Sequence, residues 1–177
     1  TELLHNATLL HDDVADDSPT RRGRPTVMSL LGGRASVLLG DYWLVKAIDN
    51  VLVNKTSSSE VIKVFSRTLA DLAEGEILQL QKADLGDTAE NDYYRIIFNK
   101  TASLFVTSAE SAAISVSASA EKMKAVKSYA EYLGIAFQIR DDIFDYEENP
   151  DTGKPVGLDL KEKKITLPLL GALNNAS

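Results

Sequence analysis

Residues 3–16 read LLHNATLLHDDVAD, and the placement of the apolar residues in this stretch indicates the class of the fold. Leucine, alanine and valine recur there at spacings of three and four residues, which is the period of one face of an α-helix. Four further long segments show the same period, and no segment alternates between apolar and polar residues over the length of a strand. The sequence therefore predicts a predominantly helical, all-α protein.

The segments that interrupt this period set the expected helix boundaries. Residues 17–26, DSPTRRGRPT, are rich in proline, glycine and charge, which predicts a charged loop. The pair Gly32-Gly33 is expected to delay the second helix, and Ser57 and Glu60 have the spacing of a capping box that opens the third. The expected helices cover residues 1–16, 27–53, 57–82, 88–116 and 119–148, with loops at 83–87 and 149–164 and a sixth helical element from residue 166.

The composition is that of a compact globular protein. The chain has 177 residues, of which 44% are hydrophobic and 25% are charged, and its length suits one ordinary domain. We therefore expect a single domain over residues 1–177. Because the chain has no cysteine, a disulfide scaffold, a thiolate metal site and a cysteine nucleophile are all excluded within it.

The charge balance narrows the possible partners. Acidic residues outnumber basic ones by 26 to 19, for a net charge of −7, which argues against binding to nucleic acid or to an anionic membrane. No run of 18 or more apolar residues predicts a transmembrane segment, and the first residues lack a signal peptide. We expect a cytoplasmic protein. Since the sequence lacks an initiator methionine and begins inside a helical pattern, we also expect it to be a piece of a longer polypeptide.

The pattern D-D-x-x-D occurs twice, near the ends of the first and fifth expected helices. The first and last aspartates of such a box lie on one helix face, about 5–6 Å apart, so their charges repel, and the partial negative charge of a helix C-terminus adds to this repulsion. A divalent cation relieves it. Magnesium is favoured because it takes one or two carboxylates and fills its other positions with water and phosphate oxygens, whereas the spacing does not match a calcium-binding loop. The candidate metal ligands are Asp12, Asp13 and Asp16 in the first box, and Asp141, Asp142 and Asp145 in the second.

Basic residues follow both boxes closely. A metal on one side and Arg or Lys on the other is a common arrangement for holding a diphosphate leaving group. One box alone would be interpreted as a solvated acidic helix end, and one basic run as a solvated surface loop, but the repeated combination favours a phosphate ester ligand. The basic residues are Arg21, Arg22 and Arg24 after the first box, and Lys154, Lys161, Lys163 and Lys164 after the second.

Five segments combine these boxes with further motifs: LLHDDVADDSPTRRGRPT (9–26), GEILQLQ (75–81), FNKTASLF (98–105), FQIRDDIFDY (137–146) and GKPVGLDLKEKKITLPLL (153–170). Together they resemble the trans-isoprenyl diphosphate synthases of the polyprenyl synthetase family, and the resemblance covers essentially the whole chain. It implies an all-helical bundle of the isoprenoid synthase type around a deep central cavity, and a homodimer. It also implies that the chain is incomplete at both ends, so that residues 1–177 are one partial domain.

The resemblance further implies a set of magnesium ligands and diphosphate ligands. Asp12 and Asp16 would coordinate two Mg²⁺ ions and Asp141 a third, so that three ions grip one diphosphate. Asp142, Asp145 and Asp159 would act through water or support these ligands. The allylic diphosphate would be held by Arg21, Lys100, Lys154 and Lys164, and isopentenyl diphosphate would face His5 and Arg22.

The implied reaction is ionisation of the allylic diphosphate, condensation with isopentenyl diphosphate and loss of a proton to the released diphosphate. It needs no protein nucleophile, and no side chain stands out as the general base. Thr101 and Gln138 would line the place where the allylic cation forms, Phe137 would pack beside the condensing carbons, and Gln79 is a weaker candidate nearby.

The length of the product is indicated by Ala7 and Thr8, five and four residues before the first box. Five helical residues rise about 7.5 Å, so a large side chain there would form a floor below the metals. Small residues at these positions resemble those of enzymes that make long polyprenyl chains. A short-chain farnesyl or geranylgeranyl diphosphate synthase, a terpene cyclase with one aspartate box, and a non-catalytic helical partner subunit remain alternatives.

The chain departs from the family pattern at two places. The family's amino-terminal Gly-Lys-x-x-Arg-Pro segment has no match, and its Glu-Gly-Lys reads Glu162-Lys163-Lys164. If the 177 residues were the whole protein, we would expect weak or absent turnover.

Overall fold

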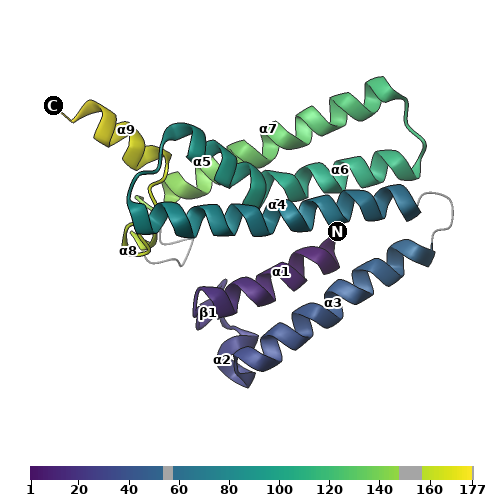
Figure 1. Ribbon diagram of the computed structural model, residues 1–177, viewed down its shortest axis with the longest axis horizontal. Helices are drawn as coiled ribbons and strands as arrows, with labels where there is room; N and C mark the ends of the chain where they lie inside the picture. Colours follow the sequence, from purple (N-terminus) through teal and green to yellow (C-terminus); the bar gives the residue numbers. More distant parts are fainter. Residues whose placement is uncertain (54–57, 148–156, 177) are drawn as a thin grey trace. The chain divides into compact units, whose positions relative to one another are not determined.

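The computed structural model describes residues 1–53, 58–147 and 157–176, and Figure 1 shows the order of the elements along the chain. These residues form two compact units, Thr1–Ile62 and Lys63–Ser177. Their regular secondary structure is helical apart from two strands of two residues each, so the all-α prediction is confirmed. In this part of the chain, no helix combines the length and the apolar character needed to cross a bilayer.

In the first unit, α1 (Glu2–Ala15) packs antiparallel to α3 (Gly33–Val53), as Figure 1 shows. The contact face of α3 carries small residues. The Ser36 hydroxyl donates a hydrogen bond to the Leu10 carbonyl at 2.8 Å, and a Cβ at Gly40 would collide with the imidazole of His11. Small residues therefore let α3 approach α1 closely, which fixes the helix that carries the first aspartate box.

The expected helix over residues 27–53 is divided in two. It forms α2 (Val27–Leu31) and α3, separated at Gly32. Gly32 has a φ of +85°, a conformation that a helix cannot contain and that glycine adopts without steric cost. The helical period continues across the pair Gly32-Gly33, so apolar spacing alone could not reveal the break.

The expected charged loop contains a β-hairpin. Strands β1 (Thr20–Arg21) and β2 (Arg24–Pro25) pair antiparallel. The two residues between them, Arg22 and Gly23, both have positive φ, +52° and +72°, as a two-residue type I′ turn requires. The hairpin holds Arg22 at its tip in a conformation that is unusual for arginine.

Helix α4 (Ser58–Leu85) belongs to the second unit from Lys63 onward. There it runs antiparallel to a helical segment made of α5 (Glu90–Ile97), the π-helix η1 (Phe98–Ala102) and α6 (Ser103–Ser115). Lys82 pairs with Asp92 at 2.9 Å near one end, and Arg67 pairs with Glu110 at 3.7 Å near the other. Helix α4 ends at Leu85, before Gly86, which is three residues later than the sequence predicted. Ser57 of the predicted capping box lies outside the described residues.

The fourth expected helix is interrupted by η1, where the backbone widens from α-helix to π-helix. The fifth is α7 (Ala120–Phe144), which packs against α6 and is shorter than expected. The expected loop at 149–164 contains a short helix, α8 (Leu158–Lys161), and the sixth element is α9 (Leu167–Asn175). The apolar side chains of α5, α7 and α9 meet in a core built from Tyr93, Ile97 and Leu170 together with Ile135, Ile139, Ile165 and Leu167.

Three helices, α1, α6 and α8, end in the same capping geometry. In each, a residue with positive φ follows the C-cap, and the next backbone N–H reaches back over the last turn, as from Ser18 to the Asp13 carbonyl at 2.9 Å. This is the Schellman motif, in which glycine is usual. Here the positions are held by Asp17, Ser117 and Lys163, with φ of +48°, +50° and +57°. Lys163 occupies the position of the glycine in the Glu-Gly-Lys motif of the family that the sequence resembles. The backbone at Lys163 has the left-handed conformation that glycine favours.

Candidate functional site

The first aspartate box divides into a buried member and two outer members. Asp13 is only 4% exposed and accepts a hydrogen bond from Arg21 Nε at 2.7 Å. Asp12 and Asp16 lie one helical turn apart, since the Asp16 backbone N–H donates to the Asp12 carbonyl at 2.8 Å. Asp16 is the exposed C-cap of α1. The outer aspartates therefore share the face that a metal could reach, and Asp13 anchors the helix end to the hairpin.

The hairpin supplies the basic side chains next to this box. Arg21 uses one of its five guanidinium N–H donors for Asp13. Arg22 is exposed at the turn, and Arg24 is exposed on β2. The first unit thus carries an acidic helix end and a basic segment next to each other; the sequence predicted this segment as a loop, and it forms a hairpin.

Three other predicted residues, His5, Ala7 and Thr8, lie earlier in α1 than the aspartate box. Burial lowers the pKa of the half-buried His5, Arg22 and Arg21 lower it further, and Glu2 opposes them. A neutral imidazole is therefore favoured. Ala7 is completely buried, and the Thr8 hydroxyl donates to the His5 carbonyl at 2.8 Å.

The second box repeats the division of the first. Asp142 is 5% exposed, and both of its carboxylate oxygens accept hydrogen bonds, from the Tyr93 hydroxyl at 2.6 Å and from Gln138 Nε2 at 2.8 Å. Burial raises the pKa of Asp142, and these two hydrogen bonds lower it. Asp141 is half-buried in the last turn of α7. In both boxes, then, the middle aspartate is an interior anchor.

Asp145, the last member of the second box, caps α8. Its carboxylate accepts the backbone N–H groups of Leu158 and Asp159, each at 3.1 Å. The pKa of Asp159 is raised to about 6, first by burial and then by the nearby carboxylates of Asp145 and Asp142, while Lys164 lowers it. Lys164 also forms an ion pair with Glu162, and Lys154 lies outside the described residues.

The donor set suits magnesium bound together with a diphosphate. Across residues 1–53, 58–147 and 157–176, no three or more His, Asp or Glu side chains form a metal cage by themselves. Magnesium does not need such a cage, because substrate oxygens and water complete its shell around one or two carboxylates. The two boxes belong to different units, so their convergence on shared ions stays a prediction.

The π-helix η1 lies between two glycines of neighbouring helices. A Cβ at Gly75 of α4 would lie 2.8 Å from Lys100 Cγ, and a Cβ at Gly134 of α7 would lie 2.5 Å from Ala102 Cα. Both helices therefore contact η1 at closer range than any side chain would allow. π-Helical turns inside α-helices occur frequently at functional sites, and this one carries Lys100 and Thr101.

The predicted residues of this region do come together. Lys100 pairs with Glu76 and donates to Gln79 Oε1 at 3.1 Å. The Thr101 hydroxyl donates to Gln138 Oε1 at 2.6 Å. These contacts join α4, η1 and α7 within the second unit.

Phe137 of α7 lies next to Phe105 of α6, with the ring centroids 5.6 Å apart. It is also partly exposed. Two functional contacts were not anticipated from the sequence: Tyr93, which binds Asp142, and Glu76, which pairs with Lys100. Nothing in the spacing of these residues marks them, because their partners lie on other helices.

Comparison with known proteins identifies the family to which the sequence is similar. The sequence model of the polyprenyl synthetase family matches residues 1–177. The octaprenyl diphosphate synthase of Escherichia coli (strain K12) is 42% identical over 177 residues, which are 99% of this chain and 54% of that protein. The chain therefore spans about half the length of the curated relatives it matches.

Two solved structures show the same fold. A decaprenyl diphosphate synthase from Rhodobacter capsulatus superposes with a TM-score of 0.91 at 40% identity, covering 99% of this chain and 54% of that one. A geranylgeranyl pyrophosphate synthetase from Pyrococcus horikoshii Ot3 gives a TM-score of 0.91 at 34% identity, covering 99% and 55%. The helical bundle predicted from the sequence is thus confirmed at the level of the fold.

Proposed function

The chain belongs to the polyprenyl synthetase family, and from this premise we propose that the full-length protein is a trans-prenyltransferase. It condenses an allylic diphosphate with isopentenyl diphosphate to give an all-trans polyprenyl diphosphate. The observation that carries the proposal is the shared construction of the two aspartate boxes, in which a buried middle aspartate anchors the helix end. Both units then belong to one domain, which we expect in the cytoplasm.

Magnesium is the cofactor that these donors favour. Asp12, Asp16 and Asp141 are the proposed ligands, and we expect three ions. When bound, Mg²⁺ stabilises the negative charge that grows on a departing diphosphate. The outer aspartates hold the ions at the helix ends, where the helix dipole would otherwise make their own charge unfavourable.

Cationic side chains of this chain bind the diphosphates. Arg21, Lys100 and Lys164 are each paired with an acid, namely Asp13, Glu76 and Glu162. These pairs keep the cations ordered before substrate arrives, and the allylic diphosphate then joins them as an additional anion; Lys154 is expected to join this group. Arg22 and the neutral His5 bind isopentenyl diphosphate.

The carbon chemistry takes place beside η1. Once the allylic C–O bond ionises, oxygen atoms with partial negative charge stabilise the cation, and Thr101 and Gln138 supply such oxygens. The alkene of isopentenyl diphosphate attacks the cation, and the adduct loses a proton to the released diphosphate. Each cycle extends the chain by five carbons.

We propose a long polyprenyl chain as the product. The octaprenyl and decaprenyl synthases are 42% and 40% identical to this chain, compared with 34% for the geranylgeranyl synthetase, and Ala7 and Thr8 are small. A short-chain synthase remains the second candidate, because the geranylgeranyl enzyme shares the fold equally well.

One assay tests activity and product length together. Full-length protein is incubated with a short allylic primer, isopentenyl diphosphate and Mg²⁺, and the products are analysed by mass spectrometry. We expect magnesium-dependent products of eight or more isoprene units. Farnesyl or geranylgeranyl products would support the second candidate, products formed without isopentenyl diphosphate would indicate a cyclase, and no consumption would favour a non-catalytic subunit.

We also propose that the protein is a homodimer through α3. Large apolar side chains on this helix are exposed, among them Leu38, Tyr42 and Val45, the last of which is 55% exposed. An apolar surface of this kind is typical of an interface, and it lies opposite the small residues that contact α1.

Sedimentation equilibrium of the full-length protein should give twice the chain mass. Val45→Glu is expected to shift the protein to monomer, because an uncompensated charge in an apolar interface is unfavourable. Val116→Glu is the matched control, since Val116 is 75% exposed at the end of α6. A wild-type protein that sediments as a monomer contradicts the proposal.

A further inference from the structure

The hydrogen bonds around Asp142 determine which way the Gln138 amide points. An ionised carboxylate only accepts hydrogen bonds, and Asp142 Oδ1 lies 2.8 Å from the terminal group of Gln138. Gln138 must therefore present its NH₂ group to Asp142. Its carbonyl oxygen then points the other way, where it accepts the Thr101 hydroxyl at 2.6 Å. With Asp142 ionised, the chemistry of the partners assigns this amide orientation.

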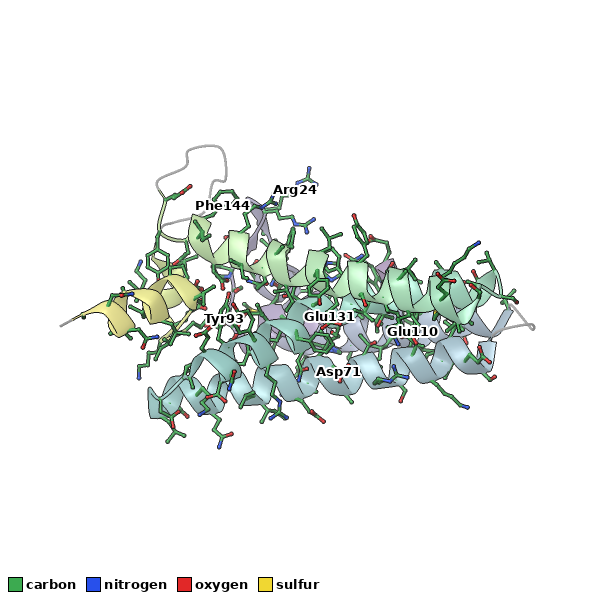
Figure 2. All side chains as sticks on the ribbon, turned by 90° about the horizontal axis from the view of Figure 1, so that it is seen from above. Arg24, Asp71, Tyr93, Glu110, Glu131 and Phe144 are labelled. Atoms are coloured by element: carbon green, nitrogen blue, oxygen red, sulfur yellow. The ribbon has the colours of Figure 1, made fainter. Side chains whose placement is uncertain are left out.

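The other oxygen of Asp142 is held by Tyr93. The Tyr93 side chain is 3% exposed and packs with Ile97 and Leu170, and Figure 2 shows it at the end of the bundle near α9. Its hydroxyl donates to Asp142 Oδ2 at 2.6 Å. Because the ring is enclosed by apolar side chains, the carboxylate cannot turn away from Gln138 without losing this bond. Tyr93 therefore restrains Asp142, and Asp142 restrains Gln138.

We propose that Tyr93 and Asp142 are positioning residues that hold the amide oxygen of Gln138 toward the reacting allylic carbons. This inference rests on the proposed function. An amide oxygen carries partial negative charge and stabilises a cation, whereas the NH₂ end of the same amide destabilises it. Inverting the amide would therefore reverse the sign of its electrostatic effect without changing its shape. Asp142 serves the reaction through Gln138 and not as a magnesium ligand.

The first test is Tyr93→Phe in the full-length protein. Loss of the hydroxyl releases one side of Asp142, and we expect kcat to fall about tenfold with KM for both substrates and the Mg²⁺ requirement unchanged. Tyr94→Phe is the control, because Tyr94 is adjacent in sequence but exposed. A rise in the Mg²⁺ requirement, or equal effects of the two substitutions, would overturn the inference.

Asp142→Asn tests the amide orientation itself. If Tyr93 donates to the new amide oxygen, the new NH₂ group faces the NH₂ of Gln138, so Gln138 must invert. We expect kcat to fall about 100-fold, more than for Tyr93→Phe, again without a change in the Mg²⁺ requirement. If Asp142 is instead a metal ligand, Asp142→Asn will raise the Mg²⁺ concentration needed for half-maximal rate.

A Gln138→Met background separates positioning from a structural role. Once the amide is removed, Tyr93→Phe and Asp142→Asn should lower kcat no further, because both act through Gln138. A purely structural role predicts that each substitution lowers kcat as much in this background as in the wild type.

A measurement without turnover distinguishes this inference from the proposed function. In protein labelled with ¹⁵N-glutamine, the side-chain NH₂ resonances of Gln138 are identified by their absence in Gln138→Met. We expect them to shift in Tyr93→Phe and to stay in place in Tyr94→Phe. Unchanged resonances in Tyr93→Phe overturn the positioning network. If the resonances shift in Tyr93→Phe but the wild-type protein has no synthase activity, the network is upheld and only the synthase assignment is contradicted.

Discussion

Gly134→Ala is expected to destabilise the protein by about 1–3 kcal/mol, the usual range for overpacking a closely packed interior. The added methyl group would lie 2.5 Å from Ala102 Cα and 2.8 Å from Ala102 Cβ, and backbone cannot move aside as a flexible side chain can. α7 must therefore shift away from η1. That shift lengthens the hydrogen bond between Thr101 and Gln138, so we expect activity to fall by on the order of 10²-fold, as misplacements near 1 Å do.

The same substitution at Gly171 is the matched control. Gly171 lies in α9 with no atom near the position of a Cβ, so alanine gains helix propensity without a clash. We expect stabilisation by up to about 1 kcal/mol. Urea unfolding and steady-state kinetics of both variants provide the check. If both substitutions change stability in the same direction, the close contact between α7 and η1 does not determine the effect.

Asp16→Asn is expected to lower kcat/KM by about 10²-fold to 10³-fold, which corresponds to several kcal/mol of lost metal stabilisation in the transition state. The Mg²⁺ concentration for half-maximal rate should rise as well. The reason is that Asp16 is an outer, exposed member of the first box at the C-cap of α1, whereas Asp13 is buried.

Asp17→Asn removes the same charge one residue further along and serves as the control. Asparagine tolerates the left-handed conformation that Asp17 adopts, so the Schellman cap of α1 should persist. We expect kcat/KM within a factor of about three of the wild type, since only long-range electrostatics change. Titration of activity with Mg²⁺ for both variants provides the measurement, and equal losses would show that net charge, not coordination by Asp16, is responsible.

The helices were predictable because their apolar period is local. The spacing of Leu4, Ala7 and Leu10 identifies the buried face of α1, and all three residues are buried. What the period could not predict was a change of backbone conformation that leaves the pattern intact. The positive φ of Gly32, the type I′ turn at Arg22-Gly23 and the π-helix are all changes of this kind.

The sequence indicated some of the residues that meet around η1, but not how they pair. The sequence indicated Lys100, Thr101 and Gln138, and the structure joins Thr101 to Gln138. It did not indicate Tyr93 or Glu76, because the contacts that reveal them arise only when separate helices pack.

The different roles within each aspartate box could have been recognised from helix geometry alone. Consecutive residues are about 100° apart around a helix axis, so Asp12 and Asp13 cannot face the same ligand. The structure shows that Asp13 and Asp142 are the members that face the interior. A sequence motif treats the aspartates of a box as equivalent, whereas in the helix they differ in direction and in burial.

The widened turn at η1 also sets the rotational phase between the two ends of the segment it joins. In an uninterrupted α-helix, Tyr93 and Thr101 would be eight steps, or about 80°, apart when viewed down the axis. One looped-out residue reduces this to about 20°, which directs both side chains to α7. If η1 straightened into an α-helix with all of its residues kept, one of the two side chains would turn away from α7, so the number of residues in this segment is matched to the widened turn.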